Sequence, residues 1–318
     1  MKAVLIDHYG SAEVLQNKEI EQPQLKPDRL LVKVYATSVN PVDWKIRNGL
    51  LKGLISTKFP TILGIDLSGE VVALGEKVTR FKPGDLVYAN LGLPGGAYAE
   101  FAAVPEKNIA LKPTNMTHEE AAAVPCAALT ALQALRDQGQ IKQGDKVLIN
   151  GASGGVGSFA VQIAKALESE VTAVCSTKNM ELVKSLGADS LIDYTQQDFT
   201  QDTIQYDIIF DAVAKSSFSS CKKVLKPNGV YITTLPTPMS FVQIVLTTII
   251  PGKKSRFIFV KPSGRDLEYI RNWIEAGKIR SLIDRTYPLS EIAAAHTYSE
   301  TQHAVGKIVL IVANQNST

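Results

Sequence analysis

The chain has 318 residues, of which 45% are hydrophobic and 20% charged, values that predict a globular protein of two domains. Its net charge is only +3, from 34 basic and 31 acidic residues. We therefore expect no nucleic-acid partner, because such a partner requires a clustered basic face. Cys126, Cys175 and Cys221 lie far apart, which argues against a disulfide framework or a zinc ribbon.

The N-terminal residues, MKAVLIDHYG, lack the basic and long apolar regions of a secretory signal. Since no targeting segment is visible, we expect a cytoplasmic protein or one of an organellar stroma. The polar residues 314–318 are the segment whose composition favours disorder. Together these features favour a reduced, intracellular enzyme.

The N-terminal third of the chain is predicted to be rich in strands. Short apolar runs bounded by glycine or proline turns predict strands at residues 2–7, 29–36, 69–73, 85–90 and 97–104. Strands at this spacing indicate an antiparallel barrel or sandwich.

The pattern changes after residue 113. Thr117 and Glu120 have the spacing of a capping box and open an alanine-rich helix. Strands and helices then alternate, with strands at 146–150, 170–175, 190–193, 207–211 and 229–234 and helices at 156–167, 178–186 and 216–225. This alternation predicts a doubly wound, parallel α/β sheet.

The C-terminal residues are predicted to return to the first domain. Helices are expected at 265–276 and from a cap at Ser290 through His296, followed by a strand at 307–312 that resembles those of the first module. The predicted division is 1–122 with 262–318 for one domain, and 123–261 for the other.

The apolar residues 239–251 are too few for a membrane span, which needs about 20. A buried or lid-forming helix is expected there, with a membrane-surface or subunit contact as the alternative. Whether the chain is a monomer or a homodimer stays open.

The strongest local motif is a glycine-rich turn between a predicted strand and a predicted helix. It runs Asn150-Gly151-Ala152-Ser153-Gly154-Gly155-Val156-Gly157. Glycines let backbone N–H groups approach a pyrophosphate at the positive end of a helix. A purely structural turn is the alternative, but the surrounding strand–helix–strand unit favours a dinucleotide site.

The second strand of this unit ends without the carboxylate that usually binds the ribose of NAD. Ser176 and Lys178 follow it instead. A hydroxyl and an ammonium suit a 2′-phosphate, so NADPH is the predicted cofactor, unless Lys178 is merely a solvated loop residue.

Four further segments resemble the zinc-independent quinone oxidoreductase branch of the medium-chain dehydrogenase/reductase superfamily. They are SVNPVDWK at 38–45, GIDLSGEV at 64–71, VPCAALTA at 124–131 and GKIV at 306–309. The resemblance covers essentially the whole chain. It is strongest to chloroplast-envelope quinone oxidoreductase homologues and enone reductases, and implies a GroES-like barrel domain beside a Rossmann domain.

The resemblance also implies that no zinc is bound. Zinc-dependent relatives have a cysteine at the position of Asn40 and His-Glu at the position of Ile65 and Asp66, and only Cys126 survives of the ligand positions. Catalytic zinc normally needs three protein ligands and an open position. The four-cysteine structural lobe is absent as well.

The implied function is transfer of hydride from NADPH to a quinone or an α,β-unsaturated carbonyl in a cleft between the domains. The resemblance places Asn40 and Thr130 at the nicotinamide and Val213 and Lys307 along the cofactor. It places Tyr194 at the adenosine ribose. Lys45 occupies a pocket position, where it either donates to an enolate oxygen or faces solvent.

Two alternatives remain at this point. One is a zinc-free alcohol dehydrogenase, which lacks a Lewis acid. The other is a non-catalytic NADPH-binding protein with a sensor, structural or RNA-binding role. The four histidines, His8, His118, His296 and His303, show no spacing typical of a site, and surface or capping positions are expected for them.

Overall fold

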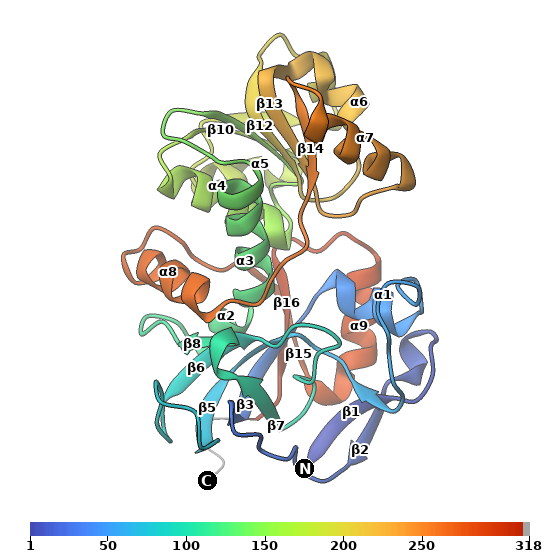
Figure 1. The fold of residues 1–318 in the computed structure, drawn as a ribbon, viewed down its shortest axis with the longest axis vertical. Helices are drawn as coiled ribbons and strands as arrows, with labels where there is room; N and C mark the ends of the chain where they lie inside the picture. The colour runs from blue at the N-terminus through green and yellow to red at the C-terminus, as the bar shows by residue number, and fades with distance from the viewer. Residues whose placement is uncertain (314–318) are drawn as a thin grey trace. The chain divides into compact units, whose positions relative to one another are not determined.

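The computed structural model describes residues 1–313, which form two units (Figure 1). The first unit contains Met1–Leu129, Lys261–Gly277 and the described residues from Ser281 onward, and the second contains Thr130–Val260 with Lys278–Arg280. The first boundary therefore falls within a helix, α3 (Pro125–Gln133), instead of at the predicted position 122/123. The predicted disordered tail, residues 314–318, lies outside the described residues.

The first unit is built on a seven-stranded sheet. Its order is β15-β16-β3-β5-β6-β8, and β7 also pairs with β3. The strands are β3 (Arg29–Val39), β5 (Asp66–Leu74), β6 (Leu86–Asn90), β7 (Phe101–Pro105), β8 (Ile109–Leu111), β15 (Ile283–Pro288) and β16 (Lys307–Ile311). All pairs are antiparallel except β15 with β16. Because β16 pairs with β3, the end of the described chain returns to this unit.

A smaller sheet and short helices complete the first unit. The sheet has the order β2-β1-β4, from β1 (Lys2–Ile6), β2 (Gln16–Glu19) and β4 (Thr61–Ile62). The helices are α1 (Pro41–Arg47), α2 (His118–Ala122), α8 (Gly264–Glu275) and α9 (Ile292–Glu300), together with the first residues of α3. The predicted capping box is present at α2, where Thr117 Oγ1 accepts from Glu120 N at 3.2 Å and Glu120 Oε2 accepts from Thr117 N at 2.9 Å.

The second unit contains the predicted parallel sheet. Its order is β11-β10-β9-β12-β13-β14, and every pair is parallel. The strands are β9 (Lys146–Asn150), β10 (Glu170–Cys175), β11 (Ser190–Asp193), β12 (Tyr206–Asp211), β13 (Leu225–Thr233) and β14 (Lys254–Phe257). In chain order this is 3-2-1-4-5-6, the Rossmann order, whose switch point lies between β9 and β12.

Several predicted elements differ from the observed ones. The predicted helix 178–186 begins as a 3-10 turn and is α5 (Met180–Ser185), and the predicted helix 216–225 is reduced to α6 (Phe218–Cys221) and a 3-10 turn. Ser290 is not a cap, because α9 starts at Ile292 after a 3-10 turn. The strands β14 and β15 were not predicted, since KSRF and IDRTYP lack apolar alternation.

The helix α7 (Pro238–Ile249) is not the buried helix expected as one option, because none of its residues is buried. Its polar side chains face the unit: Gln243 Nε2 donates to Ser219 Oγ at 2.9 Å, and Thr247 Oγ1 accepts from Ser255 N at 3.0 Å. The exposed apolar residues on and just after it are Met239, Phe241, Val242, Val245, Leu246, Ile249 and Ile250. Much of the apolar surface of this helix is thus left exposed.

No helix within residues 1–313 is long and apolar enough to cross a bilayer.

Candidate functional site

The glycine-rich turn connects β9 to α4 (Gly155–Ala166). Its glycines differ in how much space a side chain would have at each position. Gly151 has a φ of +82°, and a Cβ on it would lie 2.4 Å from Val213 Cγ1. A Cβ on Gly157 would lie 2.1 Å from the carbonyl oxygen of Gly151. At Gly154 the nearest atom to such a Cβ is 3.5 Å away. Gly151 and Gly157 are therefore required by packing, whereas Gly154 leaves its backbone open to a ligand at the helix N-terminus.

The turn lies at the switch point of the sheet. Asn150, at the end of β9, donates from Nδ2 to Asp211 Oδ1 at 2.9 Å, and Asp211 ends β12. Val213, which follows β12, packs against Gly151 and is 42% exposed. Ligands of such sheets bind beyond the carboxyl ends of the strands at this point. The structure thus brings the predicted residue Val213 to the glycine turn.

Asn179 connects the turn to the end of the second strand. Its Nδ2 donates to Ser153 Oγ at 3.0 Å and to Ser176 Oγ at 3.2 Å. Ser153 and Ser176 were predicted site residues, and Asn179 was not, although it lies three positions after Ser176. The predicted phosphate-binding residues Lys178 and Tyr194 are exposed, so both are accessible to a ligand.

A carboxylate that the sequence analysis missed lies beside this region. Asp193 ends β11 and pairs in register with Cys175, the last residue of β10. Its side chain accepts from Thr177 Oγ1, and from Thr195 Oγ1 at 2.7 Å. These hydrogen bonds, that of Thr177 first, lower the pKa of Asp193. The sequence shows Asp193 itself, but only the parallel register of β11 with β10 reveals that it lies beside the end of β10.

In the first unit, Asn40 and Lys307 lie together. Asn40 caps α1 and is 3% exposed. Its Nδ2 donates to Asp66 Oδ2 at 2.9 Å, and its Oδ1 accepts from Lys307 Nζ. Lys45 lies one turn further along α1, half-buried, with Nζ 5.4 Å from the centroid of the Trp44 ring. Burial lowers the pKa of Lys45.

The predicted site residues therefore belong to two sets. Asn40, Lys45 and Lys307 lie in the first unit. The second unit contains the glycine turn, Ser176, Lys178, Tyr194 and Val213, and it begins with the buried Thr130 on α3. The structure brings residues together within each set, and the roles assigned to them stay predictions.

Two histidines contradict the expectation of surface or capping positions. His296 is fully buried, with Nε2 3.2 Å from Tyr98 Oη, and Tyr98 donates to Asp43 Oδ2 at 3.0 Å. Burial, and next the charge of Arg47, lowers the pKa of His296 to about 3. Burial raises the pKa of Asp43 to about 7. His118, 3% exposed, pairs with Ser68.

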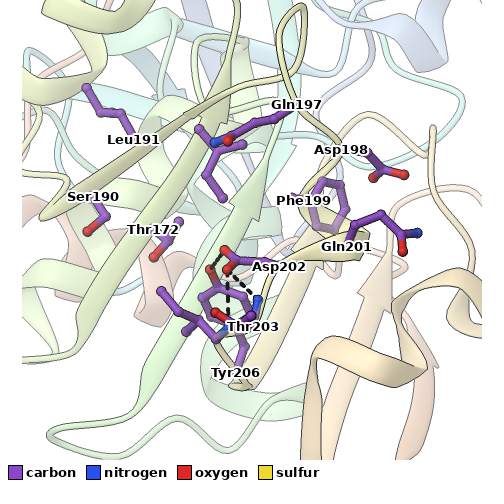
Figure 2. A pocket seen from close by; sticks show the side chains of 12 residues that line it. Thr172, Ser190, Leu191, Gln197, Asp198, Phe199, Gln201, Asp202, Thr203 and Tyr206 are labelled. Atoms are coloured by element: carbon purple, nitrogen blue, oxygen red, sulfur yellow. Dashed lines mark hydrogen bonds between the residues drawn. The ribbon is translucent and has the colours of Figure 1, made fainter.

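A cavity of about 510 Å³ lies elsewhere in the second unit (Figure 2). Its lining includes Ser190 at the start of β11 and Tyr206 at the start of β12, so it lies at the amino ends of these strands. Asp202 faces it and accepts from Thr203 N at 2.6 Å and Tyr206 Oη at 3.3 Å. None of the predicted site residues lines this cavity, and it is separate from the glycine turn at the opposite edge.

Within residues 1–313, no three side chains of His, Cys, Asp or Glu gather in a way that could hold a metal ion. The strand order and the glycine turn at the switch point define the second unit as a Rossmann fold of the class that binds dinucleotides.

Comparisons with known proteins agree with that class. Residues 26–114 match the family described as alcohol dehydrogenase GroES-like domain, and residues 186–310 match zinc-binding dehydrogenase. The chain is 38% identical to the chloroplast envelope quinone oxidoreductase homolog of Arabidopsis thaliana, with 98% of each chain covered. It is also 38% identical to the NADPH-dependent alkenal/one oxidoreductase of that plant, covering 98% of this chain and 79% of the relative.

A solved structure gives the same picture. The quinone oxidoreductase from Coxiella burnetii superposes with a TM-score of 0.88 at 34% identity, covering 98% of this chain and 99% of that one. The chain belongs to the medium-chain dehydrogenase/reductase superfamily and is an oxidoreductase with a GroES-like domain and a Rossmann domain. The predicted family and fold class are confirmed, and the non-catalytic alternative finds no support.

Proposed function

We propose that this oxidoreductase transfers hydride from NADPH to a quinone or an α,β-unsaturated carbonyl without a metal ion. The observation that carries the proposal is the pairing of Asn40 and Asp66 with Lys307, whose Nζ lies 3.7 Å from Asp66 Oδ2. The resemblance places Asn40 and Asp66 where zinc-dependent relatives have Cys and the Glu of His-Glu. The two plant relatives, a quinone oxidoreductase homolog and an alkenal/one oxidoreductase, support the acceptor class.

The side chains at those positions do not suit zinc. The carboxylate of Asp66 already accepts from Asn40 and Asn90, and an ammonium lies beside it. A cation would have to displace these donors and would be repelled by Lys307. Cys126 is buried, and one thiolate cannot replace a three-ligand set. Chelation should therefore leave activity unchanged, and zinc lost together with activity would contradict the proposal.

NADPH supplies the hydride, and the residues of this chain hold and orient it. The open backbone at Gly154 and the N-terminus of α4 fit a pyrophosphate. Ser176, Lys178 and Tyr194 are the proposed contacts of the 2′-phosphate. The ionised Asp193 nearby opposes that preference, but its oxygens are occupied by Thr177 and Thr195.

Asn40, Lys45 and Thr130 are the proposed catalytic residues. A quinone or enone is already electrophilic, so positioning of the reacting atoms contributes most of the rate. The Lys45 ammonium, whose pKa is lowered by burial, is a donor suited to a developing enolate. If Lys45→Met leaves kcat with an enone unchanged, Lys45 is a rim residue.

The deciding experiment measures NADPH oxidation with a panel of simple quinones, enones and saturated ketones. Turnover of the first two classes, and little of the third, is expected. The proposal would be overturned if the protein only oxidised alcohols with NADP⁺, or if it showed no turnover with any acceptor.

Cofactor choice is tested with Lys178→Ala, and Lys184→Ala on α5 serves as an exposed lysine control. A charge-assisted contact to phosphate contributes about 1.5–3 kcal/mol, or about 10- to 150-fold in affinity. Lys178→Ala should weaken NADPH binding and leave NADH binding nearly unchanged. If the variant weakens the binding of both cofactors equally, Lys178 does not contact the phosphate.

The exposed apolar face of α7 supports a homodimer, with a second copy of this chain covering it. The proposed location is the cytoplasm or an organellar stroma.

A further inference from the structure

A buried carboxylate joins five elements of the first unit. Asp66, the first residue of β5, is 0% exposed. Its Oδ2 accepts from Ser38 Oγ and Asn40 Nδ2, both at 2.9 Å. Its Oδ1 accepts from Asn90 Nδ2 at 3.0 Å and Cys126 N at 2.8 Å. These donors come from the end of β3, the cap of α1, the end of β6 and the first turn of α3.

The fifth element is β16, whose first residue supplies the counter-charge. Lys307 Nζ lies 3.7 Å from Asp66 Oδ2 and donates to Asn40 Oδ1, and the residue is 4% exposed. A second buried carboxylate, Asp43, accepts from the backbone N of Asn40 at 2.8 Å. Lys307 is thus the ammonium that compensates the buried carboxylate of Asp66.

The arrangement determines the orientation of the Asn40 amide. A carboxylate can only accept and an ammonium can only donate. The Nδ2 of Asn40 must therefore point to Asp66 and its Oδ1 to Lys307. A flipped amide would place a carbonyl against a carboxylate and an NH₂ group against an ammonium.

We propose that Asp66 and Lys307 are positioning residues for Asn40, together fixing the direction in which its amide meets the nicotinamide or the acceptor. This inference rests on the proposed function, in which Asn40 contacts the reacting molecules.

The test compares Asp66→Asn, Lys307→Met and the variant carrying both substitutions. Each single variant leaves one buried charge uncompensated, so we expect each to lower Tm by about 5 °C or more. Each should also lower kcat about 10- to 100-fold, because the Asn40 amide keeps only one of the two contacts that hold its direction. The dissociation constant for NADPH, measured by fluorescence, should change less than kcat does in Asp66→Asn, whose side chain is not a proposed cofactor contact.

The double variant separates positioning from mere stability. Removing both charges should restore much of Tm, whereas kcat should stay low because nothing orients the amide. Lys307→Arg, which retains a cation and donors, should keep more activity than Lys307→Met. Lys226→Met removes an ammonium that contacts Asp207 in the second unit, and it should leave kcat unchanged.

A spectroscopic measurement tests the inference without turnover. The side-chain amide signals of Asn40, identified by their loss in Asn40→Ala, should shift in both single variants and in the double variant. If kcat recovers with Tm in the double variant, or if the Asn40 signals do not respond, the inference is wrong. If the wild-type protein turns over no acceptor while these signals respond as expected, the proposed function fails and the positioning role stands.

Discussion

At the scale of the residue, buried polar groups distinguish this chain most clearly. Asn40 has both ends of its amide engaged, and it also caps α1. His118 is buried, with Nδ1 2.8 Å from Ser68 Oγ and with Nε2 left without a partner. Because Ser68 Oγ donates to Val87 O, His118 is assigned the tautomer that donates from Nδ1. For both residues, single substitutions have predictable effects that can be measured.

Asn40→Ala should lower kcat about 10- to 100-fold, because the reacting atoms lose a fixed contact. The affinity for NADPH should change much less, since the proposed phosphate contacts lie in the other unit. Steady-state kinetics and a binding titration measure the two effects. Asn48→Ala, at the C-terminal end of the same helix, is the control and should behave like wild type. An unchanged kcat would remove Asn40 from the site.

The free energy of unfolding should depend on pH through His118. Burial, and next the charge of Lys112, lowers the pKa of His118 to about 4, against about 6.5 in the unfolded chain. The stabilisation is therefore present above pH 6.5 and is lost as pH falls through 4, a difference of about 3 kcal/mol. The stability difference between wild type and His118→Gln should shrink by that amount from pH 7.5 to pH 4.

Denaturant titrations at several pH values measure this difference. Asp43 acts in the opposite sense, because its raised pKa of about 7 makes the folded state bind the extra proton. Comparison with the variant cancels that contribution. His303→Gln, in an exposed loop, is the control. A constant difference across this range would mean that His118 titrates normally.

At the scale of the element, different glycines of the glycine turn serve packing and ligand binding. Cβ atoms on Gly151 and Gly157 would meet neighbours at 2.4 and 2.1 Å, while one on Gly154 would have its nearest neighbour at 3.5 Å. The same motif therefore contains two glycines, Gly151 and Gly157, that packing requires, and a third, Gly154, where a Cβ would make only an ordinary van der Waals contact.

Gly151→Ala and Gly157→Ala should each destabilise the protein by about 1–3 kcal/mol. Gly154→Ala should keep nearly the wild-type Tm and lose NADPH affinity, because its methyl group would occupy the space available to the pyrophosphate. Thermal unfolding and a fluorescence titration test the three variants side by side. If Gly154→Ala binds NADPH with normal affinity, the pyrophosphate does not bind at Gly154.

At the scale of the whole molecule, the most prominent surface feature of the described residues is the apolar face of α7. Its polar side chains bond to its own unit, and Val245 and Ile249 are 61% and 79% exposed. An apolar face of this kind is typical of a surface that another molecule covers.

We expect the wild-type protein to be a homodimer and the double variant Val245→Lys with Ile249→Lys to be a monomer. At low protein concentration, the Tm of the variant should be close to that of the wild type. Light scattering coupled to size exclusion measures the mass across a range of concentrations. Lys253→Ala beside the helix is a control for altered charge. A wild-type protein that stays monomeric at high concentration would contradict the homodimer.

The sequence by itself determined the features that depend on near neighbours. The glycine spacing, the capping box at Thr117 and the alternation of strands and helices predicted the Rossmann unit, because each depends on residues a few positions apart. The absence of a carboxylate directly after β10 was also readable from the sequence, whereas the residues at the zinc positions were identified through the family resemblance. Elements with polar or charged sequences, such as β14 and β15, escaped that analysis.

Only the tertiary structure decided which distant groups meet. Asp66 and Lys307 are far apart in the chain, and they pair because antiparallel strands bring the start of β5 and the start of β16 to one edge. Asp193 reaches Thr177 only through the register of β11 with β10. Composition cannot reveal such pairings, because a charge or a histidine has the same letter whether solvent or a buried partner surrounds it.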